Sequence, residues 1–159
     1  MSVNYPKADL GKRFVAALVD GVIAAILGLG IPILGGLLGA AYTLTKDALM
    51  FQLTKDPQWK NKSVGKKILG LQVVNLGGGD IDIAASAKRN LTLAVGSLLS
   101  VIPLVRLVAA PLIGGVLGLI EIVLVLTDAA GRRLGDRWAN TQVIAVEEPQ
   151  TSGGVGSKG

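Results

Sequence analysis

Two long apolar stretches dominate the chain, and a polar segment separates them. They cover residues 14–45 and 91–127, and most charged residues lie before, between and after them. As a helix, each stretch would be about 50 Å long, which is too long for one pass through about 30 Å of hydrocarbon and slightly short for two. Length therefore leaves open one tilted helix or a hairpin of two helices for each stretch.

Turn-forming residues and the distribution of charge favour two hairpins. Glycine and proline interrupt the first stretch at residues 28–36, and Pro103 and Pro111 interrupt the second. Fifteen of the sixteen Lys and Arg residues lie before residue 14, within residues 46–89 or after residue 127, and only Arg106 lies at an expected outer turn. Hairpins place all three basic regions on the cytoplasmic side, in agreement with the positive-inside rule, whereas single passes would not.

These patterns predict an all-α membrane protein with four transmembrane helices, arranged as two hairpins, and with both termini in the cytoplasm. We expect a single membrane domain over residues 1–146 and a disordered tail over residues 147–159, which are rich in Glu, Ser and Gly. A cleaved signal peptide is not expected, because the first helix follows a polar lead and contains Asp20. The expected helices cover approximately residues 14–31, 33–51, 91–106 and 108–127.

The polar segment over residues 54–89 contains the pattern of a β-hairpin. An apolar run at residues 70–76 is followed by three glycines and then by residues 80–83, in which polar and apolar positions alternate. Two short strands joined by a glycine turn have this pattern. We therefore expect a short cytoplasmic β-hairpin between the two helical hairpins, with an apolar face against the membrane domain.

The second half of the chain repeats part of the first. Residues 64–74 match residues 134–144 at a constant offset of 70, and Gly, Gln, Val and a basic residue coincide. A Lys-Arg pair also introduces each hairpin, at residues 12–13 and 88–89. Two such units would be parallel repeats related by an axis along the membrane normal. The match is short, so both a true duplication and a shared way of joining a loop to a strand stay open.

Composition restricts the classes of function. Half of the 159 residues are apolar, and the chain contains neither Cys nor His. It therefore lacks a thiol nucleophile, an imidazole base, a disulfide framework and the usual ligands of zinc. No pair of nucleophile and base is visible, so we expect a protein that is not an enzyme and that uses no metal or cofactor. The net charge of +5 reports membrane topology rather than nucleic-acid binding.

Asp20 is an acidic residue within an apolar helix and is the first candidate for a functional site. A charge near the centre of a membrane helix costs about 2.5–3.5 kcal/mol on insertion, so it must face protein or water. Small residues share its helix face, which predicts that Asp20 points into the bundle. Arg13, two turns earlier, is expected to extend toward the interface instead of reaching Asp20. Asp20 would bind a proton or small cation, or act as a buried structural partner.

Glu121 is the second intramembrane acid and lies about as deep as Asp20 from the cytoplasmic end. Gly114 and Gly118 place it on a close-packing face, so the two carboxylates could meet, and their mutual repulsion would suit proton uptake and release. Alternatively, Glu121 binds a backbone group, Arg106 or a lipid amine.

A basic cluster lies in the cytoplasmic segment, beside Trp59. It does not form a phosphate-binding loop, because the early glycine of that motif is absent. Basic residues near a membrane surface attract anionic lipid head groups by about 1 kcal/mol each. The cluster either makes such contacts or is a solvated determinant of topology. Its members are Lys60, Lys62, Lys66 and Lys67.

Several motifs in combination resemble the RDD family, which is named for one Arg and two Asp residues. Arg13 opens the first helix and Asp20 lies in its middle, and glycine-containing segments follow at residues 65–74 and 133–144. Each motif alone is weak, but their combination is specific. The resemblance covers roughly residues 7–146.

The signature residues can be assigned by motif position. Arg13 and Asp20 match the Arg and the first Asp, and Asp136 matches the second Asp better than Asp128 does. The resemblance implies a small multi-pass protein in the cytoplasmic membrane of a prokaryote. Transport, including exchange of monovalent cations for protons, has been proposed for such proteins.

Two positions depart from the family pattern. A histidine often stands at the position of Gly135, and a leucine at that of Trp138. Neither departure affects the three signature residues.

Two functions are compatible with these features. In the first, Asp20, with or without Glu121, binds a proton or small cation for transport, and Arg13 and Asp136 form a cytoplasmic latch, for which Arg137 is a further candidate. In the second, the protein is an accessory, assembly or lipid-binding subunit of a larger membrane complex, and the polar residues hold its helices together. We expect membrane lipids as partners, together with a second copy of the chain or a larger complex, and no nucleic acid.

Overall fold

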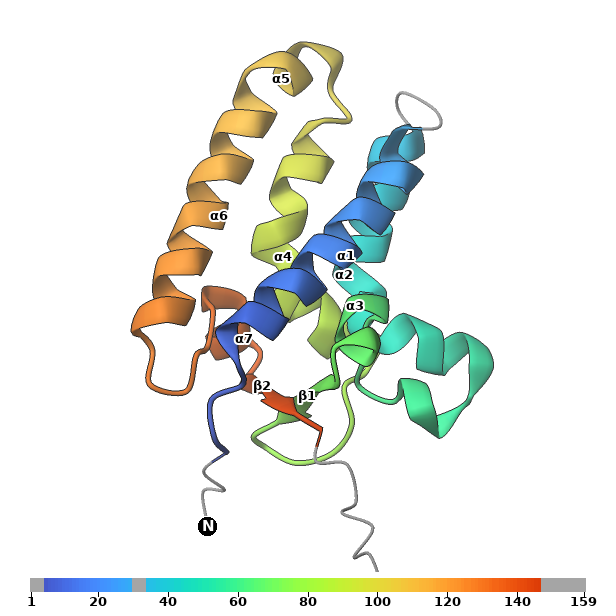
Figure 1. The fold of residues 1–159 in the computed structure, drawn as a ribbon. Coiled ribbons are helices and arrows are strands. Elements are labelled where there is room, and N and C mark those ends of the chain that lie inside the picture. Colours follow the sequence, from blue (N-terminus) through green and yellow to red (C-terminus); the bar gives the residue numbers. More distant parts are fainter. Residues whose placement is uncertain (1–4, 30–33, 147–159) are drawn as a thin grey trace, which may run out of the picture.

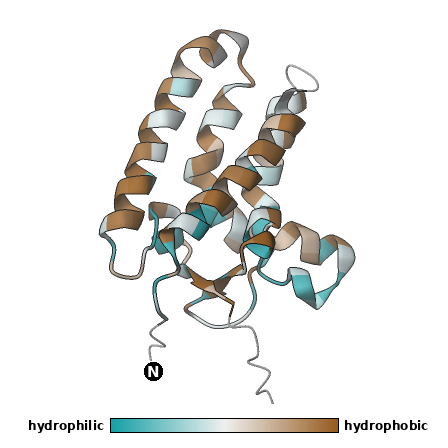
Figure 2. Ribbon diagram, viewed as in Figure 1, coloured by the Kyte–Doolittle hydropathy of each residue, from teal (hydrophilic) through white to brown (hydrophobic). Residues whose placement is uncertain are grey.

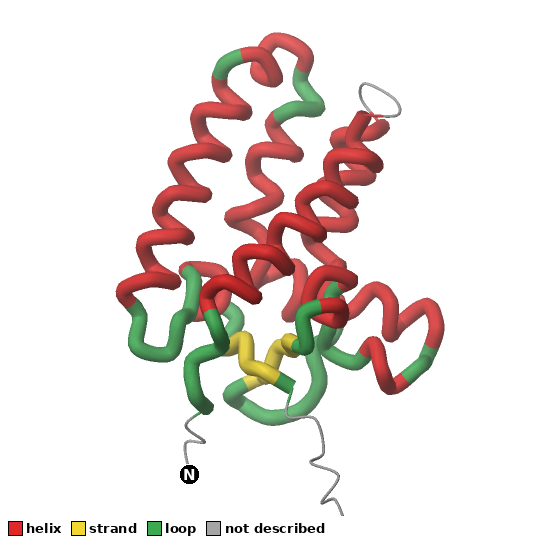
Figure 3. The backbone as a smooth tube through the Cα atoms, viewed as in Figure 1, coloured by secondary structure: helices red, strands yellow, loops and turns green. Residues whose placement is uncertain are grey.

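The computed structural model describes residues 5–29 and 34–146, except for the side chains of Leu29, Pro103 and Arg106. The described part is mostly helical, with one small sheet (Figures 1 and 3). Residues 30–33, within the expected turn region at residues 28–36, and the expected tail at residues 147–159 lie outside it. The long helices are α1 (Leu10–Leu29), α2 (Leu34–Thr54), α4 (Ile83–Leu99) and α6 (Ala109–Thr127). The short elements are η1 (Pro57–Trp59), α3 (Val64–Ile68), β1 (Leu71–Asn75), α5 (Pro103–Leu107), α7 (Leu134–Trp138) and β2 (Thr141–Ala145).

The four long helices form a bundle in which α2 and α4 are the inner pair. Helix α2 packs against both α1 and α4, and α4 also packs against α6. The elements α3, α7, β1 and β2 lie together at one end of this bundle, where the described chain also begins and ends (Figure 1). We call this the sheet end. The short helix α5 lies at the opposite end (Figure 1).

The predicted β-hairpin is wrong, because its second strand does not form. Strand β1 pairs instead with β2, from the far end of the sequence, in an antiparallel ladder. The glycine turn is present, with positive φ at Gly78 and Gly79. Directly after it, however, Asp82 has extended backbone angles and its side chain accepts a hydrogen bond from the Ala85 amide at 2.7 Å. This is the geometry of a helix N-cap, so residues 80–83 lead into α4.

The sequence repeat is a structural repeat. Helix α3 and strand β1 correspond to α7 and β2 at the same offset of 70 residues. In the ladder, Val73 lies opposite its own counterpart, Val143. The two copies are therefore related by a local twofold axis that passes between these residues, and they form one sheet together.

A glycine anchors each copy of the repeat to a long helix. Gly65 of α3 lies against the carbonyl group of Ala16, and Gly135 of α7 lies against that of Arg89. A Cβ atom at either glycine would overlap the neighbouring backbone oxygen. The glycine therefore has the same role in both copies of the repeat. It allows a short helix to pack closely against a long helix.

The expected boundaries of the third helix, residues 91–106, need correction. Helix α4 begins eight residues earlier, at Ile83, and takes up part of the segment assigned to the cytoplasm at residues 54–89. Its start is fixed by the Asp82 cap and by the helix-favouring alanines that follow. It ends at Leu99, and a separate helix, α5, begins at Pro103, since proline suits the first position of a helix.

One helix in the described part, α6, is long enough and apolar enough to cross a membrane. Only 11% of this stretch is buried, so most of it is not covered by the rest of the protein. Figure 2 shows the hydrophobic residues along the helix. The other long helices do not meet the same criterion. Helix α1 contains Lys12, Arg13 and Asp20, α2 contains the adjacent pair Lys46 and Asp47, and α4 has 17 residues.

Candidate functional site

Buried ion pairs connect five helices near the sheet end of the bundle. The pairs alternate acidic and basic side chains, each at most 10% exposed, and they join α1, α2, α3, α4 and α7. We call this set the ion-pair network. Its nitrogen–oxygen contacts are Lys46 with Asp20 (3.4 Å), Lys66 with Asp20 (4.0 Å) and Asp47 (2.7 Å), Arg89 with Asp47 (3.0 Å) and Asp136 (2.6 Å), and Arg13 with Asp136 (3.4 Å).

Asp20 lies at one end of the network and is 1% exposed. Its carboxylate accepts hydrogen bonds from the Ser63 hydroxyl at 2.6 Å, the Gly65 amide at 2.9 Å and the Tyr42 hydroxyl at 3.3 Å. Because the Gly65 amide belongs to the first turn of α3, Asp20 also fixes that short helix against α1. The small residues of α1 had predicted this inward orientation.

Lys46 is the cation nearest to Asp20 on α2. Its side chain is 8% exposed, and its Nζ forms an ion pair with the Asp20 carboxylate at 3.4 Å. Lys66 is held more firmly, since its Nζ donates to Asp47 at 2.7 Å and to the Ser63 hydroxyl at 3.3 Å. Within the network, Lys46 is therefore the more weakly held of the two lysines.

Arg89 forms the centre of the network and is fully buried. Its guanidinium donates to Asp47 at 3.0 Å and to Asp136 at 2.6 and 3.1 Å, so it joins the two halves of the chain. Asn90 adds a hydrogen bond to Asp47 at 2.9 Å. These bonds meet the requirement that a buried charge be paired and hydrogen-bonded.

Three arginines converge on Asp136 at the other end of the network. Besides Arg89, these are Arg13 at 3.4 Å and Arg133 at 3.6 Å, and the Arg133 amide also donates to the carboxylate. Burial alone would raise the pKa of Asp136. The nearby Arg89, Arg133 and Arg13 outweigh that effect and hold its pKa below the usual range.

Arg13 is buried, not extended toward the interface as expected. Its side chain is 8% exposed, contacts Asp136 and donates to the carbonyl of Gly131. No contact between Arg13 and Asp20 occurs among the described side chains. Two of the three signature residues, Arg13 and Asp136, therefore touch, and Asp20 is connected to them through Lys66, Asp47 and Arg89.

Glu121 is buried but lies apart from the network and from Asp20. The Thr92 hydroxyl donates to one carboxylate oxygen, and the Leu134 amide donates to the other at 2.9 Å. Of the alternatives considered for Glu121, the structure shows a backbone partner. Glu121 thereby holds the first turn of α7, as Asp20 holds that of α3.

Two expectations about basic residues are wrong. Lys66 does not lie at the surface, because it is buried against Asp47 and Asp20. Arg137 is not part of the latch, because it extends away from the network to Asp128 at 2.9 Å and is 44% exposed.

The other lysines of the basic cluster lie nearer the surface. Lys60 is 45% exposed and pairs with Asp80 at 3.0 Å, while Lys62 is half-buried. The Nζ of Lys67 lies 3.8 Å from the centre of the Trp59 ring, as a cation–π contact.

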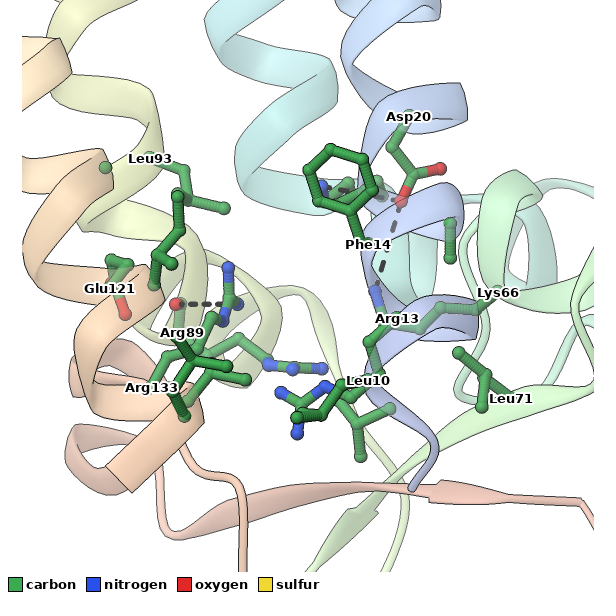
Figure 4. Close-up of a pocket in the computed structure, with 18 residues that line it drawn as sticks. Leu10, Arg13, Phe14, Asp20, Lys66, Leu71, Arg89, Leu93, Glu121 and Arg133 are labelled. Carbon is green, nitrogen blue, oxygen red and sulfur yellow. Dashed lines mark hydrogen bonds and ion pairs between the residues drawn. The ribbon is translucent and has the colours of Figure 1, made fainter. Parts of the chain in front are cut away.

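Two cavities meet at Asp20 and Lys46. The first, of about 340 Å³, lies between α1, α4 and α6 and reaches the sheet end, where Leu71 and Val143 line it (Figure 4). The second, of about 590 Å³, lies between α1, α2 and α4 and extends toward Ser100 at the opposite end. The residues that line both are Ala17, Asp20, Lys46 and Leu93.

Sequence reasoning missed Arg89 and Asp47 as site residues. The signals for both were present, since Arg89 corresponds to Arg13 in the repeat and Asp47 is an acid within a long helix, like Asp20. Their pairing joins α4 to α2, which no local pattern reveals. Among the described residues, no group of three or more acidic side chains is arranged to hold a metal ion.

Comparison with known proteins gives one result that identifies a family. Searches of curated proteins and of solved structures found no match. The sequence model of the RDD family matches residues 7–140, which is most of the chain and includes Arg13, Asp20 and Asp136. Together with the apolar helix α6, the match indicates a membrane protein. The chain therefore belongs to the RDD family.

Proposed function

We propose that this RDD protein exchanges a small monovalent cation for a proton across a membrane, at Asp20 and Lys46. These two side chains line both cavities, and their shared position is the main support for the proposal. From this pair, one cavity leads toward the sheet end and the other toward the opposite end. An ion held by Asp20 would thus have a route toward each side of the membrane.

In the proposed arrangement, the protein has four membrane passes in the cytoplasmic membrane of a prokaryote. Helices α1, α2, α4 with α5, and α6 form the passes. Large apolar side chains that face outward support this, among them Leu18 and Ile26 on α1 and Leu119 and Val123 on α6. The sheet end, with its basic loops and both termini, faces the cytoplasm, as the positive-inside rule predicts.

Proton exchange follows from competition for Asp20. While Lys46 is protonated, its ammonium group neutralises Asp20 and repels a cation. When Lys46 loses its proton, the carboxylate keeps only the longer contact with Lys66, at 4.0 Å, and can bind a cation. The hydroxyl oxygens of Tyr42 and Ser63 lie nearby as additional ligands. Cation binding and Lys46 protonation thus exclude each other, and the charge of the site stays constant. This exchange includes no covalent step and requires no cofactor.

The experiment is a flux measurement with purified protein in liposomes that contain a pH-sensitive dye. An imposed Na⁺ or K⁺ gradient should drive proton movement in wild-type vesicles. Asp20→Asn should abolish it, because the amide cannot carry the charge that attracts the cation. Asp80→Asn is the matched control, since Asp80 is 53% exposed and pairs with Lys60 outside both cavities.

Folding must be monitored in the same samples. Thermal unfolding and size-exclusion profiles in detergent show whether Asp20→Asn still folds with one acceptor oxygen in place of the two that serve Ser63, Gly65 and Tyr42. A folded Asp20→Asn protein with wild-type flux would contradict the proposal.

A second candidate function is that of an accessory subunit in a larger membrane complex. It is favoured by the extensive hydrogen bonding of Arg89, Asp47 and Asp136, which suits a purely structural network. Purification in mild detergent separates the two functions. Stable copurification with a large unrelated complex, together with no flux by the protein alone, would support the accessory role.

A further inference from the structure

We propose that the cavity between α1, α4 and α6 binds the head group of an anionic phospholipid, with the acyl chains along α6. This site is not the lysine cluster near Trp59, with which it shares only Lys66. It rests on the membrane orientation proposed above but not on cation exchange, because head-group recognition uses the arginines and the apolar walls of this cavity.

The walls of the cavity are apolar and open to the surroundings. Phe14, Ile122 and Leu126 line it, yet they are 66%, 52% and 57% exposed. These side chains therefore stand at an opening between α1 and α6, on the surface that would face lipid. The volume of about 340 Å³ lies at the small end of the range for ligand pockets, about 300–1,000 Å³. It suits a head group better than a whole lipid.

The polar part of the cavity is formed by three arginines. Arg13, Arg89 and Arg133 all line it, and Figure 4 shows them gathered between α1 and α6. Arg133 is the most accessible of the three, with 15% of its side chain exposed. Its Nη2 donates to Asn90 at 3.1 Å, while its Nη1 makes no hydrogen bond among the described residues. A guanidinium with free donors is well suited to a phosphate group.

Charge balance at the cavity favours an anion. The network together with Arg133 and Glu121 contains five basic and four acidic side chains, so one positive charge is in excess. Glu121 lines the cavity, but both of its oxygens already accept hydrogen bonds, from Thr92 and from the Leu134 amide. The basic members are Arg13, Lys46, Lys66, Arg89 and Arg133, and the acidic ones are Asp20, Asp47, Glu121 and Asp136.

The depth of the arginines suits a head group. Arg13 belongs to the first turn of α1, and Leu71 and Val143 of the sheet close the cavity on that side. In the proposed orientation, this level is the cytoplasmic surface of the bilayer, where anionic head groups attract basic residues. The apolar walls continue from there along α6, in the direction of the acyl chains.

The experiment is a titration of delipidated protein in detergent, followed by native mass spectrometry. Phosphatidylglycerol and phosphatidylcholine with identical acyl chains are compared. We expect tighter binding of phosphatidylglycerol, and a weakening of about tenfold or more in Arg133→Gln, because a charge-assisted hydrogen bond is lost. Arg137→Gln is the matched control, since Arg137 pairs with Asp128 outside the cavity, and it should bind like wild type.

A second pair of variants tests the apolar wall without changing a charge. Ile122→Trp should obstruct the opening and reduce lipid binding, whereas Leu119→Trp, which is exposed on α6 but does not line the cavity, should not. Equal binding of the two lipids, or wild-type affinity in both Arg133→Gln and Ile122→Trp, would overturn the proposal. So would equally tight binding of glycerol phosphate, because the site would then recognise a free phosphate and not a lipid.

Discussion

Arg89 shows how the network is stabilised at the scale of single residues. Its guanidinium is completely buried, and its charge is balanced by Asp47 and Asp136 on opposite sides. Removing a buried charge from water costs several kcal/mol, and the attraction of well-placed partners offsets this cost. Without Arg89, the buried carboxylates of Asp47 and Asp136 would lose their shared partner, and Lys66 and the remaining arginines alone would balance them.

Replacement of Arg89 should therefore be strongly destabilising. We expect Arg89→Met to lower the free energy of unfolding in detergent by about 3–5 kcal/mol, the usual effect of breaking a buried pair. The control is Arg137→Gln, which removes a pair with Asp128 whose arginine side chain is 44% exposed, and it should cost about 1 kcal/mol. Similarly small decreases in the free energy of unfolding for both variants would show that the network contributes little to stability.

The depressed pKa of Asp136 predicts a dependence of stability on pH. In the unfolded chain, an Asp has a pKa of about 3.9, whereas the arginines keep the folded value lower. The stabilisation is therefore complete above about pH 4 and is lost as the pH falls toward the folded pKa. The melting temperature in detergent should decrease below about pH 4, and less steeply in Asp136→Asn. If the melting temperature of Asp136→Asn depended on pH as steeply as that of the wild type, Asp136 would not be the source of the effect.

At this scale, the sequence predicted the burial of Asp20 but not its partners. Small residues on one helix face are a local signal, and they indicated correctly where Asp20 points. Its partners Ser63, Gly65 and Lys66 come from α3 and the N-cap before it, and their contact depends on how that short helix packs. Lys66 was therefore interpreted as a surface residue.

At the scale of elements, glycine determines how the two short helices dock. Gly65 and Gly135 occupy equivalent positions in α3 and α7, and each lies against the backbone of a long helix. A methyl group there would overlap a carbonyl oxygen that cannot move independently of its helix. We therefore attribute the coincidence of these glycines in the repeat to packing.

This attribution predicts opposite results for two substitutions of the same type. Gly135→Ala should reduce the free energy of unfolding by about 1–3 kcal/mol through overpacking. Gly21→Ala should be neutral or stabilising, since a Cβ at Gly21 meets nothing within 4 Å and alanine favours a helix. Denaturant titration in detergent would measure both, and an unaffected Gly135→Ala protein would contradict the packing explanation.

The repeat was visible in the sequence, but the pairing of its strands was not. Residues 80–83 alternate as a strand does, and the adjacent glycine turn made a local hairpin the simplest interpretation. The cap at Asp82 decides against it, because it starts α4 at that point. Strand β1 then pairs with β2. No local sequence pattern predicts a contact between segments that lie 70 residues apart.

At the scale of the whole molecule, the proposed orientation can be tested with single cysteines, since the chain has none of its own. Asp9→Cys and Gln58→Cys place thiols at exposed positions near the sheet end, and Leu104→Cys places one on α5, where Leu104 is 84% exposed. An impermeant maleimide added to intact cells should label only Leu104→Cys. Inside-out vesicles should give the reverse pattern. Labelling of all three from one side would contradict four passes.

The most direct test of exchange measures cation uptake and proton release in the same liposomes. Wild-type protein should take up Na⁺ or K⁺ and release an equal amount of protons, because Lys46 and the cation compete for Asp20. Lys46→Met has no proton to exchange at this site, so its cation-driven proton release should disappear. Wild-type proton release in a folded Lys46→Met protein, or cation uptake by wild type without proton release, would contradict exchange at Asp20 and Lys46.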